Sequence, residues 1–324
     1  MNNKEIYKKT LTFSIRRFFW DLGSIAVLIV LSAAGFFIAD KATNNGLVGL
    51  VIGVVAAIIL IAIASHFVSY VFKAGQIAMM TKGVSEGKLP EDVYAEGKKI
   101  VKERFLTVAG YYAATSLIKG IFNQLGNAIS SIGEAVGGDT GNAIGSAIAS
   151  VINTVVRYLC DCCLGWVFYK KDEKATKATL EGAAIFFKHG KTFAKNMGRV
   201  FGISLISFVV IGGAFFGITY LICMAFPGAF ESIANEFAEM AAAGEIEGDA
   251  SFFTNITNLM LVTSALGGVM MWSVLHSVFV RPFILVGVLR NFIESGKNEK
   301  ITEADLDKVD AKSAKFKKLH EEVA

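Results

Sequence analysis

Two charged side chains lie within an otherwise apolar stretch and are the first candidates for chemistry. Arg157 and Asp161 belong to the run RYLCDCCLGWVFY and are four residues apart. Helical residues at this spacing share one face and can form an ion pair. Because ionisable groups inside a bilayer are costly, they mark either a functional site or a structural salt bridge. Both interpretations remain open: a pair that binds a solute or ion in a cavity, or one that fixes helix packing.

Further polar side chains occur in other apolar runs. Lys119, Asn123 and Asn127 recur every four residues, so they form one polar stripe that could line a pore, or Lys119 could extend to the headgroups. His66 and His276 could relay protons or bind a solute, or each could bond to a neighbouring helix. We expect a cavity lined by these two histidines, Lys119 and the charged pair.

The cysteines and the missing catalytic motifs argue against an enzyme. Cys160, Cys162 and Cys163 could bind a soft metal, but the sequence has no second ligand pair at a suitable spacing. Packing by small polarisable side chains explains them better, and a cysteine near the inner boundary could be palmitoylated. Phosphate-binding glycine loops, HExxH and GxSxG are absent from the sequence. We expect no catalytic residues, metal site or cofactor.

These residues must be positioned by membrane-spanning helices. Apolar residues make up 53% of the 324-residue chain, and several apolar runs exceed the roughly 20 residues that cross a hydrocarbon core. The sequence therefore predicts an all-α, polytopic helical membrane bundle of about six spans. The expected spans are about 22–38, 47–72, 105–128, 143–169, 200–226 and 253–280. No basic tract interleaved with aromatic residues supports nucleic-acid binding.

The distribution of basic residues predicts the topology. The N-terminus, 73–104, 170–199 and the chain after 280 hold 29 of the 32 lysines and arginines. The alternate loops hold one, Lys41. Since such an excess marks cytoplasmic loops, both termini are expected in the cytoplasm. Residues 1–298 would form the membrane domain, and 299–324 a polar cytoplasmic tail that is a surface helix or a frayed end.

Three basic segments suggest an internal repeat. IAMMTKGVSEGK at 77–88 and VGVLRNFIESGK at 286–297 are similar, each with a histidine upstream, and Asp161 lies at about the corresponding depth of a looser middle copy. We expect three helical hairpins whose elbows, 74–88, 173–189 and 282–297, are interfacial amphipathic helices with lysines at anionic headgroups. The alternative is that any membrane hairpin with a basic end shows this pattern.

Three short motifs resemble the choline transporter-like membrane family. They are Cys162-Cys163-Leu164, Gly190-Lys191-Thr192-Phe193 and Arg199-Val200, in this order. The resemblance covers about a third of the chain. This sequence lacks the family's longer array of spans and has Arg281 and Arg290-Asn291 where the family places acidic residues. The resemblance implies movement of choline or another small cationic metabolite.

Two functional hypotheses follow. The first is an integral membrane transporter or channel-like protein for a small solute, with a polar site inside the helix bundle. The second is a non-transporting membrane scaffold or assembly subunit, whose charges fix packing and whose basic elbows bind anionic lipids or partner proteins. The expected partners are membrane lipids, preferentially anionic, and a small solute. Assembly as a homo-oligomer is left open.

Overall fold

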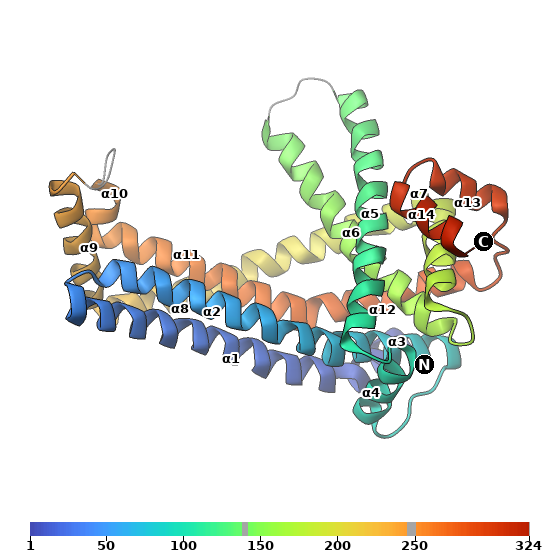
Figure 1. The fold of residues 1–324 in the computed structure, drawn as a ribbon, viewed down its shortest axis with the longest axis horizontal. Coiled ribbons are helices and arrows are strands. Elements are labelled where there is room, and N and C mark those ends of the chain that lie inside the picture. The colour runs from blue at the N-terminus through green and yellow to red at the C-terminus, as the bar shows by residue number, and fades with distance from the viewer. Residues whose placement is uncertain (138–141, 245–250, 324) are drawn as a thin grey trace. The chain divides into compact units, whose positions relative to one another are not determined.

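The computed structural model describes residues 1–137, 142–244 and 251–323, and their side chains outside 69, 108, 125–155 and 190–199. Within these residues every regular element is a helix, which confirms the all-α prediction (Figure 1). The α-helices are α1 Asn3–Thr43, α2 Gly46–Val68, α3 Ala74–Glu86, α4 Val93–Arg104, α5 Val108–Gly137, α6 Asn142–Tyr169, α7 Ala175–Ser207, α8 Gly213–Ala225, α9 Pro227–Ala242, α10 Ser251–Thr254, α11 Ile256–Leu275, α12 Arg281–Gly296, α13 Glu303–Asp310 and α14 Ala314–Val323. Three π-helical segments are η1 Ser69–Lys73, η2 Phe208–Gly212 and η3 His276–Val280.

The chain divides into two compact units, each made of separate stretches of sequence. Unit 1 comprises Met1–Arg17, His66–Gly202 and Arg281–Ala324, and unit 2 comprises Phe18–Ser65 and Ile203–Val280. The division therefore falls within long helices. The polar tail belongs to unit 1.

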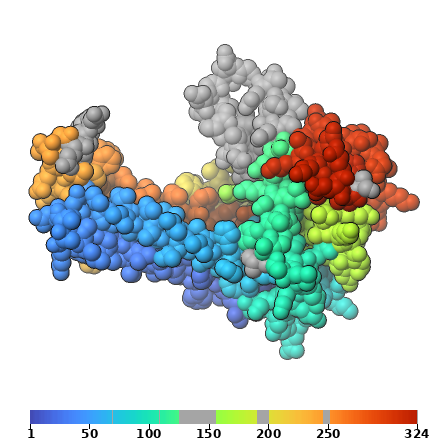
Figure 2. Space-filling view, in the orientation of Figure 1, coloured from blue at the N-terminus to red at the C-terminus, as the bar shows by residue number. Residues whose placement is uncertain are grey.

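Unit 2 consists of long apolar helices with exposed outer faces. In Figure 2, α1 and α2 (blue) lie along one another on the visible face. Side chains such as Val30, Ile52 and Leu221 are 63%, 63% and 68% exposed. An apolar surface of this kind is stable only where lipid or another apolar partner covers it. These helices have the character of membrane spans.

Four helices among the described residues are long and apolar enough to cross a membrane. They are Asn3–Thr43, Gly46–Glu86, Val200–Ala225 and Ile256–Gly296, and the bent pair Val93–Arg104 and Ala109–Gln124 would make a fifth if it is one span. The expected spans at 105–128 and 143–169 lie partly outside the residues whose side chains are described.

Glycines bring α1 and α2 together. A Cβ atom on Gly49 would collide with the carbonyl oxygen of Gly35, and one on Gly53 would collide with the backbone of α1. Gly49 and Gly53, which have the GxxxG spacing, therefore allow α1 and α2 to pack closely. The pair Gly141/Gly145 lies outside the residues whose side chains are described.

A different glycine contact joins η2 to α11. Gly213 and Gly217 also have the GxxxG spacing, but both have open space around their Cβ positions. Instead, a Cβ atom on Gly268 would lie 2.7 Å from the carbonyl oxygen of Gly212. The GxxxG spacing at 213–217 indicated a contact on this helix turn, but the residue that makes the contact is the adjacent Gly212.

Unit 1 has a dense core in which α3, α6 and α12 pack against one another. Met79, Trp166, Ile185, Val286 and Phe292 are each at most 2% exposed. Helices α3 and α12 of this core correspond to two of the predicted elbows. Ile185 belongs to the third predicted elbow, 173–189. We expected the apolar halves of the elbows to face lipid. That expectation is wrong for most of these side chains, which protein buries, whereas Phe187 and Phe283 are 38% and 51% exposed.

The C-terminal tail is docked and not frayed. Val309 and Phe316 are fully buried and Leu319 is 4% exposed, so the sparse apolar positions of the tail form one contact surface. The Ser313 hydroxyl donates to Gln124 Oε1 of α5 at 2.7 Å. Helices α13 and α14 are therefore an integral part of unit 1.

Candidate functional site

The π-helical segments identify where two long apolar helices change register. Segment η1 ends at Lys73 directly before α3, and η3 is followed directly by Arg281, the first residue of α12. Segments of this kind are rare and frequently occur at functional sites. Each of the two long helices thus has a basic residue at the end of its π-helical segment or directly after it. Both basic side chains contact the same carboxylate.

That carboxylate is Asp161 of α6, which is 3% exposed. Lys73 Nζ lies 2.8 Å from Asp161 Oδ1. Arg281 donates to Asp161 Oδ2 at 2.5 Å. We name Asp161, Lys73 and Arg281 the Asp161 cluster. It joins α6 to the beginnings of α3 and α12, the three helices that form the centre of unit 1.

The two cations are held to different extents. Arg281 also donates to the carbonyl oxygen of Arg157 at 3.2 Å, and its guanidinium carbon lies 5.5 Å from the centre of the Tyr158 ring. Lys73 has the single ion pair with Asp161, and its side chain is 33% exposed, compared with 19% for Arg281. The Tyr158 hydroxyl is buried and has no hydrogen-bond partner among the described residues. Arg281 is therefore the anchored cation and Lys73 the accessible one.

The expected ion pair between Arg157 and Asp161 is not what the structure contains. Arg157 is exposed and contributes its carbonyl oxygen, while Asp161 pairs with Lys73 and Arg281. Lys73 and Arg281 lie at the ends of two expected spans and are distant from Asp161 in the sequence. The prediction was right that Asp161 forms a buried ion pair and wrong that Arg157 is its partner.

The other predicted site residues are described within their own units. His66, in unit 1, has its ring centre 4.6 Å from that of Tyr112, whose hydroxyl donates to the His66 carbonyl oxygen. His276, in unit 2, has Nε2 3.0 Å from the Ser204 hydroxyl. Lys119 is exposed on α5, and the side chain of Asn127 is outside the described ones. Each histidine thus contacts a neighbouring helix, as one of the two interpretations predicted.

The cysteines of α6 are packing residues. Cys162 and Cys163 are fully buried, and Cys163 Sγ lies 3.7 Å from the carbonyl oxygen of Thr179 on α7. A Cβ atom on Gly182 would lie 2.9 Å from the same sulfur. This close approach of α7 to α6 favours the packing explanation over a metal site.

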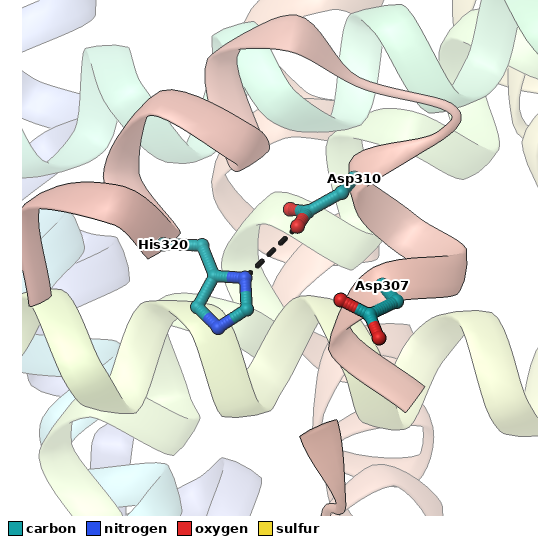
Figure 3. A group of neighbouring side chains, drawn as sticks. All are labelled: Asp307, Asp310 and His320. Atoms are coloured by element: carbon teal, nitrogen blue, oxygen red, sulfur yellow. Dashed lines mark hydrogen bonds and ion pairs between the residues drawn. The ribbon is translucent and has the colours of Figure 1, made fainter. Parts of the chain in front are cut away.

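A second polar cluster, which the sequence did not reveal, connects the two tail helices (Figure 3). His320 Nδ1 lies 2.9 Å from Asp310, and its Nε2 lies 3.2 Å from Glu303. The hydrogen bond with Asp310 raises the pKa of His320 above its usual value. Asp307 lies nearby, with ligand atoms of the three residues Asp307, Asp310 and His320 within 4.8 Å. Because both ring nitrogens already contact carboxylates, this cluster fastens α14 to α13.

Comparisons of the chain with models of protein families, with curated proteins and with solved structures found no match. The function is therefore inferred from the residues and their geometry. The resemblance to the choline transporter-like family remains a prediction from short motifs.

Proposed function

We propose that this chain is an integral membrane transporter for a small cationic solute, with Asp161 as the carboxylate that binds it. The observation that carries the proposal is the burial of Asp161 between two cations, each at a π-helical junction of a long apolar helix. Buried charge beside interrupted helices is typical of transporter sites. The resemblance stated above implies the same solute class.

The charge of the Asp161 cluster suggests how binding would work. One carboxylate faces two cations, so the cluster carries a net charge of +1 and would repel an additional cation. Lys73 has one partner and the more exposed side chain, whereas Arg281 is held at several points. Release of Lys73 would leave a neutral pair with one carboxylate oxygen available. The Lys73 ammonium group would thus occupy the place of the solute's cationic group until solute displaces it.

We further propose six spans with both termini in the cytoplasm, arranged as three related hairpins. The one-sided basic residues support the topology. Support for a repeat comes from η1 and η3, which precede α3 and α12 in the same way. Labelling of single cysteines at Glu231 and Asp172 tests the topology. Labelling of both from the same side of the membrane would contradict it.

Uptake by purified protein in vesicles tests transport. With radiolabelled choline as the probe, wild type should accumulate label above protein-free vesicles, and Asp161→Asn should abolish the difference. Asp172→Asn, at an exposed position shortly after α6, is the matched control and should transport normally. Lys73→Gln should bind choline more tightly, because no internal cation competes. Uptake that persists in a folded Asp161→Asn protein would refute the site.

A folded wild-type protein that neither binds nor moves choline or other small cations would favour the alternative, a non-transporting scaffold. The burial of the elbows weakens one basis for that alternative, since most of their apolar side chains are not available to lipid.

A further inference from the structure

Helix α9 lies in a segment that looked like an acidic loop. The acidic segment 231–249 lies between two of the expected spans, and Pro227–Ala242 is a helix. Its apolar side chains Phe230, Ile233, Phe237 and Met240 recur at intervals of three or four residues and therefore share one face. The same helix also carries glutamates. An amphipathic helix needs an apolar partner for its apolar face, and unit 2 supplies only part of one.

The apolar face of α9 lines a groove of about 560 Å³ within unit 2. The beginning of α2, including Leu47 and Leu50, and the beginning of α11, including Leu259, form its other walls. Among the described residues, Thr263 is its one polar lining residue, and no charged side chain lines it. The volume lies within the range of ligand sites in proteins. In Figure 2, α9 (orange) lies beside the beginning of α2 (blue).

A hydrogen bond from the backbone of α2 to a side chain of α9 connects the two helices across the groove. Glu236 accepts a hydrogen bond from the Leu47 backbone N–H at 2.7 Å, which satisfies one of the unpaired donors at the start of α2. Two walls of the groove are therefore joined by a polar contact beside its apolar lining.

We infer that this groove holds one acyl chain of a membrane phospholipid. Its walls continue into Val48, Val51 and Ile52, which are 51%, 58% and 63% exposed on the outer apolar face of α2. In a bilayer that face is covered by acyl chains, so the same chains can enter the groove without crossing a polar barrier. An apolar groove without charged lining gives no anchor to a soluble ligand.

The charge around the groove favours a zwitterionic lipid. Glu236 lies beside the groove, where its carboxylate accepts the bond from α2, and Glu231 and Glu239 are exposed on the same helix. An anionic headgroup beside these carboxylates would be repelled, whereas the ammonium group of a zwitterionic headgroup would be attracted. The proposed ligand is thus a phosphatidylcholine-like or phosphatidylethanolamine-like lipid with one acyl chain inserted between α9 and α2.

Photolabelling of the full-length protein tests this inference. Phosphatidylcholine with a diazirine on one acyl chain would be mixed into phosphatidylcholine vesicles containing the protein, and labelled peptides would be mapped by mass spectrometry. We expect labelling of the α9 face to exceed that of Ile58, an outer-face residue of α2, several-fold. Equal labelling would mean surrounding lipid only and would overturn the inference. Cross-links between two copies of the chain at α9 would also overturn it.

Variants that fill the groove provide the control. Ile233→Trp and Thr263→Trp enter it from opposite walls, and each should reduce labelling of the α9 face several-fold. Ile58→Trp adds the same side chain to the outer face and should leave that labelling unchanged. Undiminished labelling in either folded groove variant would overturn the inference. If both variants fail to fold, the wild-type ratio decides alone.

Discussion

Replacement of Asp161 by asparagine should destabilise unit 1 strongly, because it leaves two cations facing a neutral amide. Removing one member of a buried ion pair costs about 3–5 kcal/mol. Two unit charges of the same sign that share one partner repel by about 3 kcal/mol at a separation of about 6 Å and an effective dielectric constant of about 20, which falls within this range. Lys73→Met alone leaves the neutral pair of Asp161 and Arg281. Since the Lys73 side chain is 33% exposed, this change should cost about 1 kcal/mol or less.

The double variant separates this arrangement from the one that sequence spacing suggested. Adding Lys73→Met to Asp161→Asn removes the repulsion between the two cations and should recover about 2–3 kcal/mol. Arg157→Met should recover nothing, because the Arg157 side chain is exposed and its backbone carbonyl survives the change. Arg157 is the matched control for removal of a positive charge.

Unfolding by sodium dodecyl sulfate in mixed micelles measures these differences. Fluorescence of Trp166, which is 2% exposed in the core of unit 1, can report the transition if Trp20 and Trp272 are first replaced by phenylalanine. Two results would refute the reasoning: a cost of Asp161→Asn below about 1 kcal/mol, or recovery by Arg157→Met equal to that by Lys73→Met.

Other regions give three further predictions. Gly49→Ala should destabilise unit 2 by about 1–3 kcal/mol, because its methyl group meets the backbone of α1, whereas Gly217→Ala should be neutral or stabilising; equal effects in thermal unfolding would contradict this. Phe316→Ala should cost about 3–5 kcal/mol and speed proteolytic removal of the tail, since Phe316 is fully buried. Because the folded pKa of His320 is raised, its contribution to tail stability is full below the unfolded pKa of about 6.5 and is lost as pH rises through the folded pKa. Asp310→Asn should weaken this dependence; protease protection that grows across that pH range in wild type would be the wrong sign.

Helix type and apolar character could be read from the sequence because they depend on local composition. The runs within α1, α2, α8 and α11 are long, continuous and nearly free of charge, so their exposed apolar surfaces follow directly. The helix α9 was missed because its glutamates dominate the composition of a short segment. Its apolar residues recur with helical spacing, and this signal could have found it.

The site was half predictable for a physical reason. Burial of Asp161 follows from its apolar neighbours in sequence, and a buried carboxylate needs a cation. The choice of cation depends on which distant helix ends meet α6. Arg157 was the nearest basic residue in sequence, whereas Lys73 and Arg281 become neighbours of Asp161 only when α3 and α12 pack against α6.

A π-helical segment changes the rotation about the helix axis between the two ends of a long helix. An α-helix turns by about 100° per residue, so one surplus residue within a turn rotates everything beyond it by that angle. In Gly46–Glu86, η1 lies between α2, whose side chains include many exposed apolar ones, and α3, whose side chains are mostly buried. A deletion of one residue there would preserve hydropathy and length almost unchanged. It would nevertheless force one of the two faces to point the wrong way.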